Sequence, residues 1–266
     1  MSKKMSNAPV YYALAQIKFN HVAAMEKFVP DIQEQLRRFG FTHFDTKKTT
    51  VLEISASQDQ LTGEPKLNTV RNWDFAKKDK TSGYVLGESF VSFHTTFYET
   101  STEFFESLIQ GLRVVHEIVN LDHVSRLGIR YLDAIIPAEG ETAEKYLAKG
   151  LHGINFSTPP KYFMSESVFE TTLDTDEVLG TLICRTHRVN APLGYPPDLN
   201  PTELVRMDRF IVNEPVPHSI VDTDHYVDVS MEVNFDLVRR KLTSLHAELI
   251  SVFEATTTPY ARSTWK

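Results

Sequence analysis

Two stretches of this sequence carry apolar residues at spacings of three and four, and each closes a run of segments in which apolar and polar residues alternate. The first stretch, 104–119, follows the tetrapeptide Thr-Ser-Thr-Glu at 100–103, a capping box that satisfies backbone donors at a helix start. The second stretch is 234–255. Because an amphipathic helix must bury its apolar stripe and an alternating strand offers one apolar face, the pattern predicts helices packed on sheets.

The alternating segments form two similar series. The two-residue period predicts strands over 10–19, 50–57, 67–78, 83–97, 125–136, 162–175, 179–190, 203–212 and 219–230. A helical stretch at 22–39 and a short helix at 142–151 follow the first strand of each series. The order β-α-β-β-β-α thus occurs twice, with an extra strand in the second series. We predict an α+β fold of two related units, 10–122 and 123–266, each an antiparallel sheet backed by a long helix, packed as one continuous globule.

The composition limits the partners and the compartment. Lysine and arginine number 28 against 35 for aspartate and glutamate, a formal charge of −7, which argues against a general nucleic-acid binder. No apolar run of about 18 residues is present, so we expect no membrane partner. The first residues lack an apolar signal core, and the single cysteine, Cys184, cannot pair within the chain, so we expect a cytoplasmic protein. The apolar neighbours of Cys184 predict a buried thiol.

The sequence lacks the common catalytic motifs. It contains no glycine-rich phosphate loop, no Gly-x-Ser-x-Gly elbow and no His-Glu-x-x-His pair. Ser92 and His94 share a strand face, but the partners of a catalytic triad meet only in space, so spacing cannot assemble one. We therefore predict no catalytic residue and no cofactor, and the sequence favours a non-catalytic protein while leaving catalysis open.

The candidate metal ligands are Asp222, Asp224 and His225, because carboxylates and an imidazole can bind a divalent ion. The neighbouring Val221 and Val227, however, fit a half-buried strand whose other face is simply wet. We therefore expect no metal, and we keep the three residues only for the alternative of a metal-dependent hydrolase or nuclease.

A polar strand face is the more informative feature. Arg126 and Arg130 flank Gly128 on one side of the strand at 125–136. Charged residues also share faces in the two strands expected to form the hairpin 162–190. Either these side chains form a cross-strand charge ladder, which we favour because like-charged arginines need neutralising neighbours, or they recognise an anionic ligand or a partner. The candidate binding residues are Arg126, Arg130, His94, Glu170, Arg185 and His187.

A proline-rich segment lies between the last strands of the second series. Residues 191–201 contain four prolines and a tyrosine. Long loops of this kind are often binding elements, but they also serve as stiff connectors. The sequence leaves both interpretations open.

The sequence resembles one family. The run Ser-Arg-Leu-Gly-Ile-Arg-Tyr-Leu-Asp-Ala-Ile at 125–135 resembles the R-L-G-L-R-Y-x-N/D-x-I strand of an uncharacterised, sporadically distributed bacterial protein family of similar length. Further similar segments are 14–19, Trp73 with Phe75, 98–104, 221–224 and the closing helix with Phe253. The family has no established activity, so the resemblance implies one continuous module and no catalytic residue. The scattered distribution implies an accessory system of the defence or toxin–antitoxin type.

Three functional hypotheses follow from these observations. The first is a non-catalytic binding or regulatory protein that acts through a protein partner or through self-association. The second is a protein or enzyme that holds a small anionic ligand in a pocket between a sheet and a long helix. The third is the metal-dependent hydrolase or nuclease described above.

Overall fold

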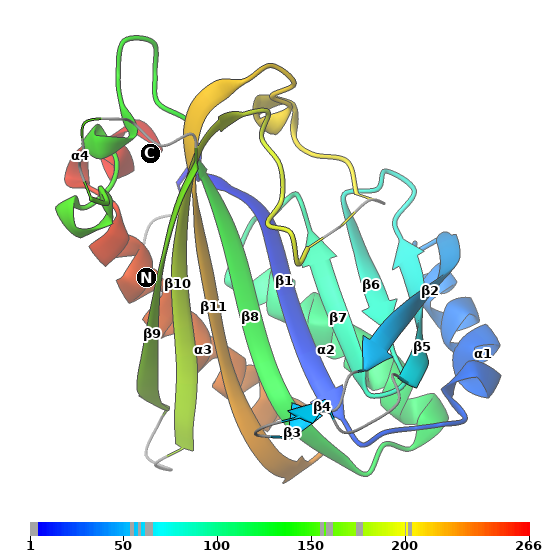
Figure 1. The fold of residues 1–266 in the computed structure, drawn as a ribbon. Helices are drawn as coiled ribbons and strands as arrows, with labels where there is room; N and C mark the ends of the chain where they lie inside the picture. The colour runs from blue at the N-terminus through cyan, green and yellow to red at the C-terminus, as the bar shows by residue number, and fades with distance from the viewer. Residues whose placement is uncertain are drawn as a thin grey trace.

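An antiparallel sheet of nine strands organises the described part of the chain (Figure 1). The computed structural model describes residues 5–266 except 54–55, 58–59, 62–65, 155–156, 158–161, 174–177, 200 and 202–203. The strand order is β2-β5-β6-β7-β1-β8-β11-β10-β9. The strands are β1 Val10–Phe19, β2 His43–Glu53, β5 Lys66–Ala76, β6 Ser82–Leu86, β7 Phe90–Thr95, β8 His123–Ile135, β9 Tyr162–Leu173, β10 Val178–Ala191 and β11 Val216–Glu232, with a separate short pair, β3 Ala56–Ser57 and β4 Gln60–Leu61.

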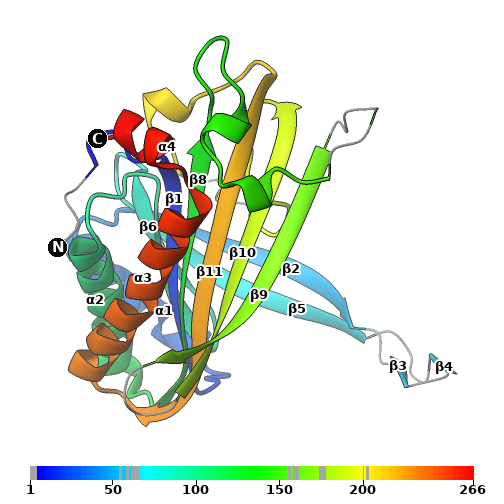
Figure 2. The ribbon, with the colours of Figure 1, turned by 90° about the vertical axis from the view of Figure 1, so that its left-hand side faces the viewer.

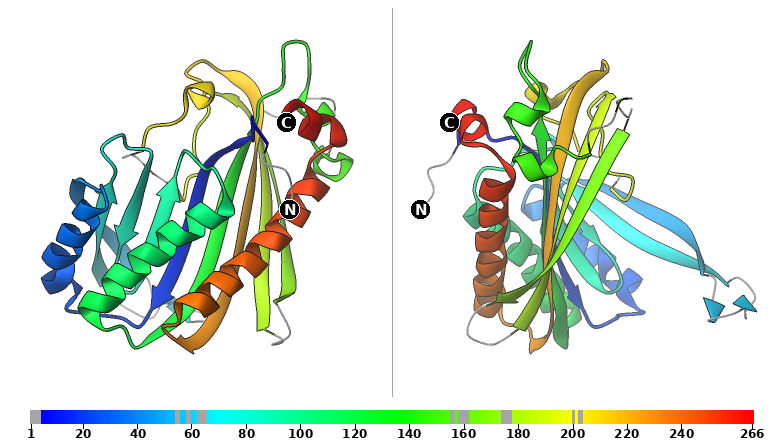
Figure 3. Two further views of the ribbon diagram at one scale, coloured as in Figure 1. Left: turned by 180° about the vertical axis from the view of Figure 1, so that it is seen from behind. Right: turned by 60° about the vertical axis from the view of Figure 1, so that its left-hand side comes forward.

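Three helices cover one face of the sheet and leave the other uncovered (Figures 2 and 3). They are α1 Met25–Arg38, α2 Ser101–Val119 and α3 Phe235–Thr256, and a short α4 Pro259–Thr264 follows near the carboxyl end. The Thr100 hydroxyl accepts a hydrogen bond from the Glu103 backbone at the start of α2, which confirms the predicted cap. No helix in the described residues is long and apolar enough to cross a membrane. We call the uncovered side of the sheet the open face.

The predicted α+β class and antiparallel pairing are confirmed, but the halves do not form two separate sheets. The first strands of the halves, β1 and β8, pair with each other at the centre, so the sheet is continuous through both. The helix predicted at 142–151 consists of two single 3-10 turns, Ala143–Lys145 and Lys149–Leu151. The extra strand predicted at 203–212 is wrong: the described part of this segment is a loop with a 3-10 turn at Asp208–Phe210.

The main core lies between the sheet and the helices. Alternate residues of the central strands supply it, as the two-residue period predicts, and α2 and α3 pack over them. The core members from β1 and β8 include Ala13, Ala15, Ile17, Phe19, Leu127, Ile129 and Tyr131. The two-residue period would place Tyr11 with them, but a register shift at the start of β1 takes it into another cluster.

That second cluster lies on the open face. The described residues of 192–215, between β10 and β11, fold back over one end of the face, and we call them the strap. Leu193 and Phe210 of the strap pack with Tyr12 and Leu132 of the sheet. The described part of 203–212 is not a strand, because its buried side chains pack onto the face of the sheet and its backbone adds no strand to a sheet edge. Most of the open face beyond the strap has no covering helix.

Candidate functional site

The open face displays the polar side chains that the alternation in β8 predicts. Arg126, Gly128 and Arg130 point to this face, while the intervening Leu127 and Ile129 are buried beneath the helices. Across the ladder, β11 places Asp228 opposite Arg126, Tyr226 opposite Gly128 and Asp224 opposite Arg130. The register therefore sets two arginines of one strand against two carboxylates of the next.

Arg130 is the centre of the network and is almost fully buried, with 8% of its surface exposed. Its Nε and Nη2 atoms donate to the Asp222 carboxylate at 2.8 and 2.7 Å. Its Nη1 and Nη2 atoms donate to Asp198 of the strap at 2.5 and 3.1 Å. Burial alone would raise the pKa of Asp222, but the neighbouring His187 and Arg130 outweigh it and hold that pKa below its usual value. Arg130 thus fastens the strap to the sheet.

The network continues across β10 to the edge strand β9. Arg185 donates to Glu166 at 2.5 Å, and its Nη1 atom lies 3.7 Å from Asp222. Glu166, Arg185, Asp222, Arg130 and Asp198 form one row of alternating charge, which we call the charge ladder. This is the cross-strand arrangement that the sequence favoured, and it shows what neutralises Arg130.

The other candidate residues lie at varied distances from this row. His187 is buried next to it, 3.9 Å from the Asp222 carboxylate, and its Nδ1 atom lies 2.9 Å from the Tyr162 hydroxyl. Glu170 is exposed on β9, opposite Thr181.

His94 is enclosed on β7, where its Nδ1 atom lies 3.1 Å from the Tyr12 hydroxyl. Burial, with a smaller contribution from Lys47, lowers the pKa of His94 to about 4. At neutral pH its ring is therefore uncharged and offers no positive charge to an anion.

The three residues kept for the metal alternative, Asp222, Asp224 and His225, do not come together in the fold. His225 points away from Asp222 and Asp224 and is buried under α3, where its ring nitrogens lie 3.0 Å from the Leu245 carbonyl and 2.7 Å from the Thr171 hydroxyl. The reason is elementary, because consecutive strand residues face opposite sides and His225 directly follows Asp224. Within the described residues, no three His, Cys, Asp or Glu side chains are grouped to hold a metal ion. The idea that these three residues converge is wrong.

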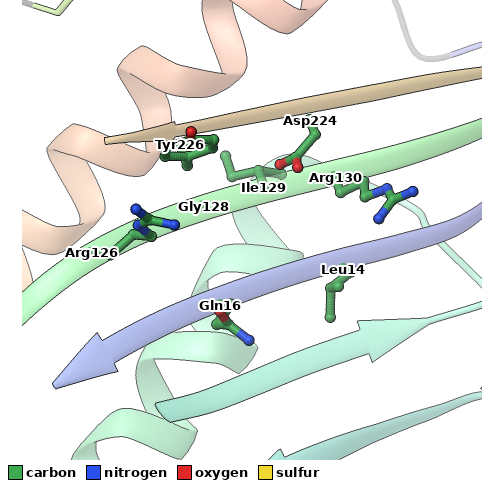
Figure 4. Close-up of a pocket in the computed structure, with 8 residues that line it drawn as sticks. All are labelled: Leu14, Gln16, Arg126, Gly128, Ile129, Arg130, Asp224 and Tyr226. Atoms are coloured by element: carbon green, nitrogen blue, oxygen red, sulfur yellow. The ribbon is translucent and has the colours of Figure 1, made fainter. Parts of the chain in front are cut away.

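A small pocket opens between β1, β8 and β11 (Figure 4). Its volume is about 170 Å³, and it lies on the open face, not between the sheet and the long helix as expected. Its lining residues are Leu14, Gln16, Arg126, Gly128, Ile129, Arg130, Asp224 and Tyr226. Gly128 forms the floor of the pocket and has no side chain to fill it. A Cβ at this position would lie 3.3 Å from the Tyr226 Cβ.

Asp224 is the distinctive group of this pocket. Its carboxylate forms no hydrogen bond or ion pair with any residue the structure describes, although it is largely buried. Burial raises the pKa of Asp224 to about 6, and the attraction of Arg130 only partly offsets this effect. In contrast, Arg126 pairs with Asp228 at 2.5 Å and stacks 4.4 Å from the Tyr226 ring centre.

Sequence reasoning missed two parts of this site. Asp198 belongs to the proline-rich segment, whose composition indicated a special loop without indicating where it docks. The pocket walls Leu14 and Gln16 come from β1, which meets β8 only through the sheet topology.

No protein-family model and no curated protein matches this chain.

Proposed function

We propose that this chain is a non-catalytic binding protein that recognises a protein partner with the open face of its sheet. The observation that carries the proposal is a row of exposed apolar side chains beside the charge ladder. Tyr162, Met164 and Val168 of β9 are on the open face and are 53%, 46% and 58% exposed. Apolar contacts next to ordered polar groups are typical of protein interfaces, in which tyrosine, methionine and arginine are enriched.

The position of β9 strengthens this proposal. β9 is the last strand of the sheet, so one row of its backbone donors and acceptors has no neighbouring strand in the described fold. Such an edge can accept an extended segment of another protein. A second copy is the less favourable occupant, because antiparallel pairing of two β9 strands about Val168 would set Glu166 opposite Glu170. We therefore favour a different protein as the partner.

Crosslinking in cells, followed by calorimetry with the purified proteins, tests this function in two steps. A photo-crosslinking residue at Val168 should capture one reproducible partner in the source cells, whereas the same residue at Glu117 on α2 should not. The partner is then purified, and its affinity is measured by calorimetry. Val168→Asp should weaken binding at least tenfold, and Glu117→Lys should change it less than twofold. Contacts confined to the helical side, or a dimer formed by this chain alone through β9, would overturn the proposal.

We also propose that the halves 10–122 and 123–266 are related units. In support, each half keeps its strands on its own side of the β1–β8 seam, and in each half the first strand lies beside the last. Related sequences provide the test, because a true duplication requires matching residues at corresponding positions of the two halves. Independent patterns in the two halves would contradict it.

We finally propose a setting for the partner. The resemblance of residues 125–135 to the sporadically distributed bacterial family supports a cytoplasmic protein of a bacterial accessory system, of the defence or toxin–antitoxin type. In that case the captured partner should be encoded beside this chain. A partner encoded at an unrelated position would contradict this setting and leave the open-face interface intact.

A further inference from the structure

We propose that the pocket at Asp224 receives a cationic group, the ammonium or guanidinium end of a lysine or arginine side chain that the partner protein presents. This inference rests on the proposed function and specifies which chemistry the open face selects. The sequence suggested an anionic ligand, whereas the charges around the pocket indicate the opposite sign.

The size of the pocket limits its occupant. Its volume of about 170 Å³ is well below the roughly 300–1,000 Å³ of sites for drug-sized ligands. It can hold the end of one long side chain, but a nucleotide is too large. The floor at Gly128 lies between Arg126 and Arg130, and Leu14 and Tyr226 stand on its two sides (Figure 4). These walls suit the methylene stem of a lysine or arginine, which packs on apolar surface while its charged end is hydrogen-bonded.

The charges select a cation because the arginines around the pocket are already paired with carboxylates. Arg126 holds Asp228, and Arg185 holds Glu166. Arg130 is shared by Asp222 and Asp198. Asp224 is the carboxylate of the pocket that has no such partner. An incoming anion would therefore be repelled by Asp224, and the arginines that line the pocket are already paired. Lys18 faces Arg126 across β1 and β8 and acts on Asp228, and neither Lys18 nor Asp228 lines the pocket.

The polar wall supplies a second acceptor. Gln16 donates from its Nε2 atom to the Ser92 hydroxyl at 3.0 Å, which orients its amide and leaves the amide oxygen to accept. An ammonium or guanidinium carries three or more donors, so one carboxylate and one amide oxygen can both be used. The arrangement is therefore a counter-ion with a supporting acceptor.

Proton binding should be linked to this recognition. Burial keeps part of the Asp224 population protonated near pH 6, and a bound cation favours the ionised form. The charged groups that act on Asp224 are Arg130 of β8, Asp222 of its own strand, Arg185 of β10 and Asp198 of the strap. The affinity for a cation should therefore rise between pH 5 and pH 7 and then level off.

The test uses small probes of defined charge with the full chain. N-acetyl-arginine methylamide and N-acetyl-lysine methylamide are titrated while the NMR signals of Gly128 and the Leu14 methyl groups are followed. The neutral citrulline analogue and the anionic glutamate analogue are the comparison probes. We expect saturable shifts with the two cations, at least tenfold weaker binding of citrulline and no saturation with glutamate. Equal binding of arginine and citrulline, or preference for glutamate, would overturn the inference.

Three variants connect the probes to the pocket. Asp224→Asn should weaken the binding of both cationic probes at least tenfold. Gly128→Ala, which fills the floor of the pocket while keeping every charge, should weaken their binding to the same extent. Glu170→Gln is the control, because it removes an exposed carboxylate of the open face that does not line the pocket. If both pocket variants bind like the control, the inference is wrong.

The partner protein separates this inference from the proposed function. If Val168→Asp abolishes partner binding but Asp224→Asn leaves it unchanged, the open-face function stands and the cation pocket is wrong. If the probes bind at Asp224 but no partner uses the open face, the proposed function fails and the inference fails with it, because the pocket then serves free cations and not a partner side chain.

Discussion

Arg130 of β8 donates two parallel hydrogen bonds, of 2.8 and 2.7 Å, to Asp222 of β11, and Asp222 is completely buried. A bidentate pair of this kind satisfies both groups only while both are present. The same guanidinium also holds Asp198, so one side chain joins two strands and the strap. The consequences of breaking this arrangement can be measured.

Removing Arg130 should be costly because it leaves Asp222 charged and buried. We expect Arg130→Met to lower the free energy of unfolding by about 3–5 kcal/mol, measured by urea denaturation. Adding Asp222→Leu should recover most of this loss, because the orphaned charge disappears. Arg126→Met is the control on the same strand face, and its more exposed pair with Asp228 should cost about 1 kcal/mol or less. Similar losses for the two arginines would contradict the assigned roles.

Asp198 should stabilise the docking of the strap on the sheet. It is 61% exposed at its side chain, so its pair with Arg130 contributes at most about 1 kcal/mol to closure. Asp198→Ala should therefore raise tryptic cleavage after Arg206 and Arg209 by up to about fivefold, with little change in melting temperature. Asp228→Ala serves as the control and should leave the cleavage rate unchanged. An unaltered rate in Asp198→Ala would mean that packing alone holds the strap.

Asp133 should make the protein less stable as the pH rises. Burial raises the pKa of Asp133 to about 7, above the value of about 3.9 in an unfolded chain. A raised carboxyl pKa means that the folded state binds the proton more tightly, so the penalty is absent below about pH 4 and complete above about pH 7. Asp133→Asn should thus gain stability over the wild type at pH 8, by at most about 4 kcal/mol. Urea denaturation at pH 4 and pH 8 measures this difference, and an equal gain at both would contradict the assignment.

Gly111 should resist replacement although it lies inside a helix. A Cβ at this position of α2 would lie 2.4 Å from a carbon of the Tyr84 ring, which is itself fixed between Phe41 and Phe93. Alanine favours a helix over glycine by about 1 kcal/mol, whereas overpacking a core costs about 1–3 kcal/mol. We expect Gly111→Ala to destabilise the protein by up to about 2 kcal/mol, measured by thermal unfolding. A stabilised variant would show that Tyr84 can move aside.

Local patterns were sufficient for much of the fold. Period and capping located the central strands, α2 and α3, and the alternation in β8 correctly set Arg126 and Arg130 on one face, because strand geometry depends on neighbouring residues alone. The same rule, applied to Asp224 and His225, excludes their convergence on a metal. The patterns failed at 203–212, where apolar residues pack downward from a loop, and at 83–97, which is two strands, β6 and β7, joined by a turn.

What the sequence by itself determined was which residues turn together toward a helix or toward solvent, since that follows from backbone periods of two and 3.6. Tertiary structure alone decided which strands became neighbours. The pairing of β8 with β11 set Asp222 beside Arg130, the docking of the strap added Asp198, and the meeting of β1 with β8 enclosed the space in front of Asp224. These contacts join residues far apart in the chain. Which charged side chains meet, and how deeply they are buried, depends on register and packing, which no local pattern contains.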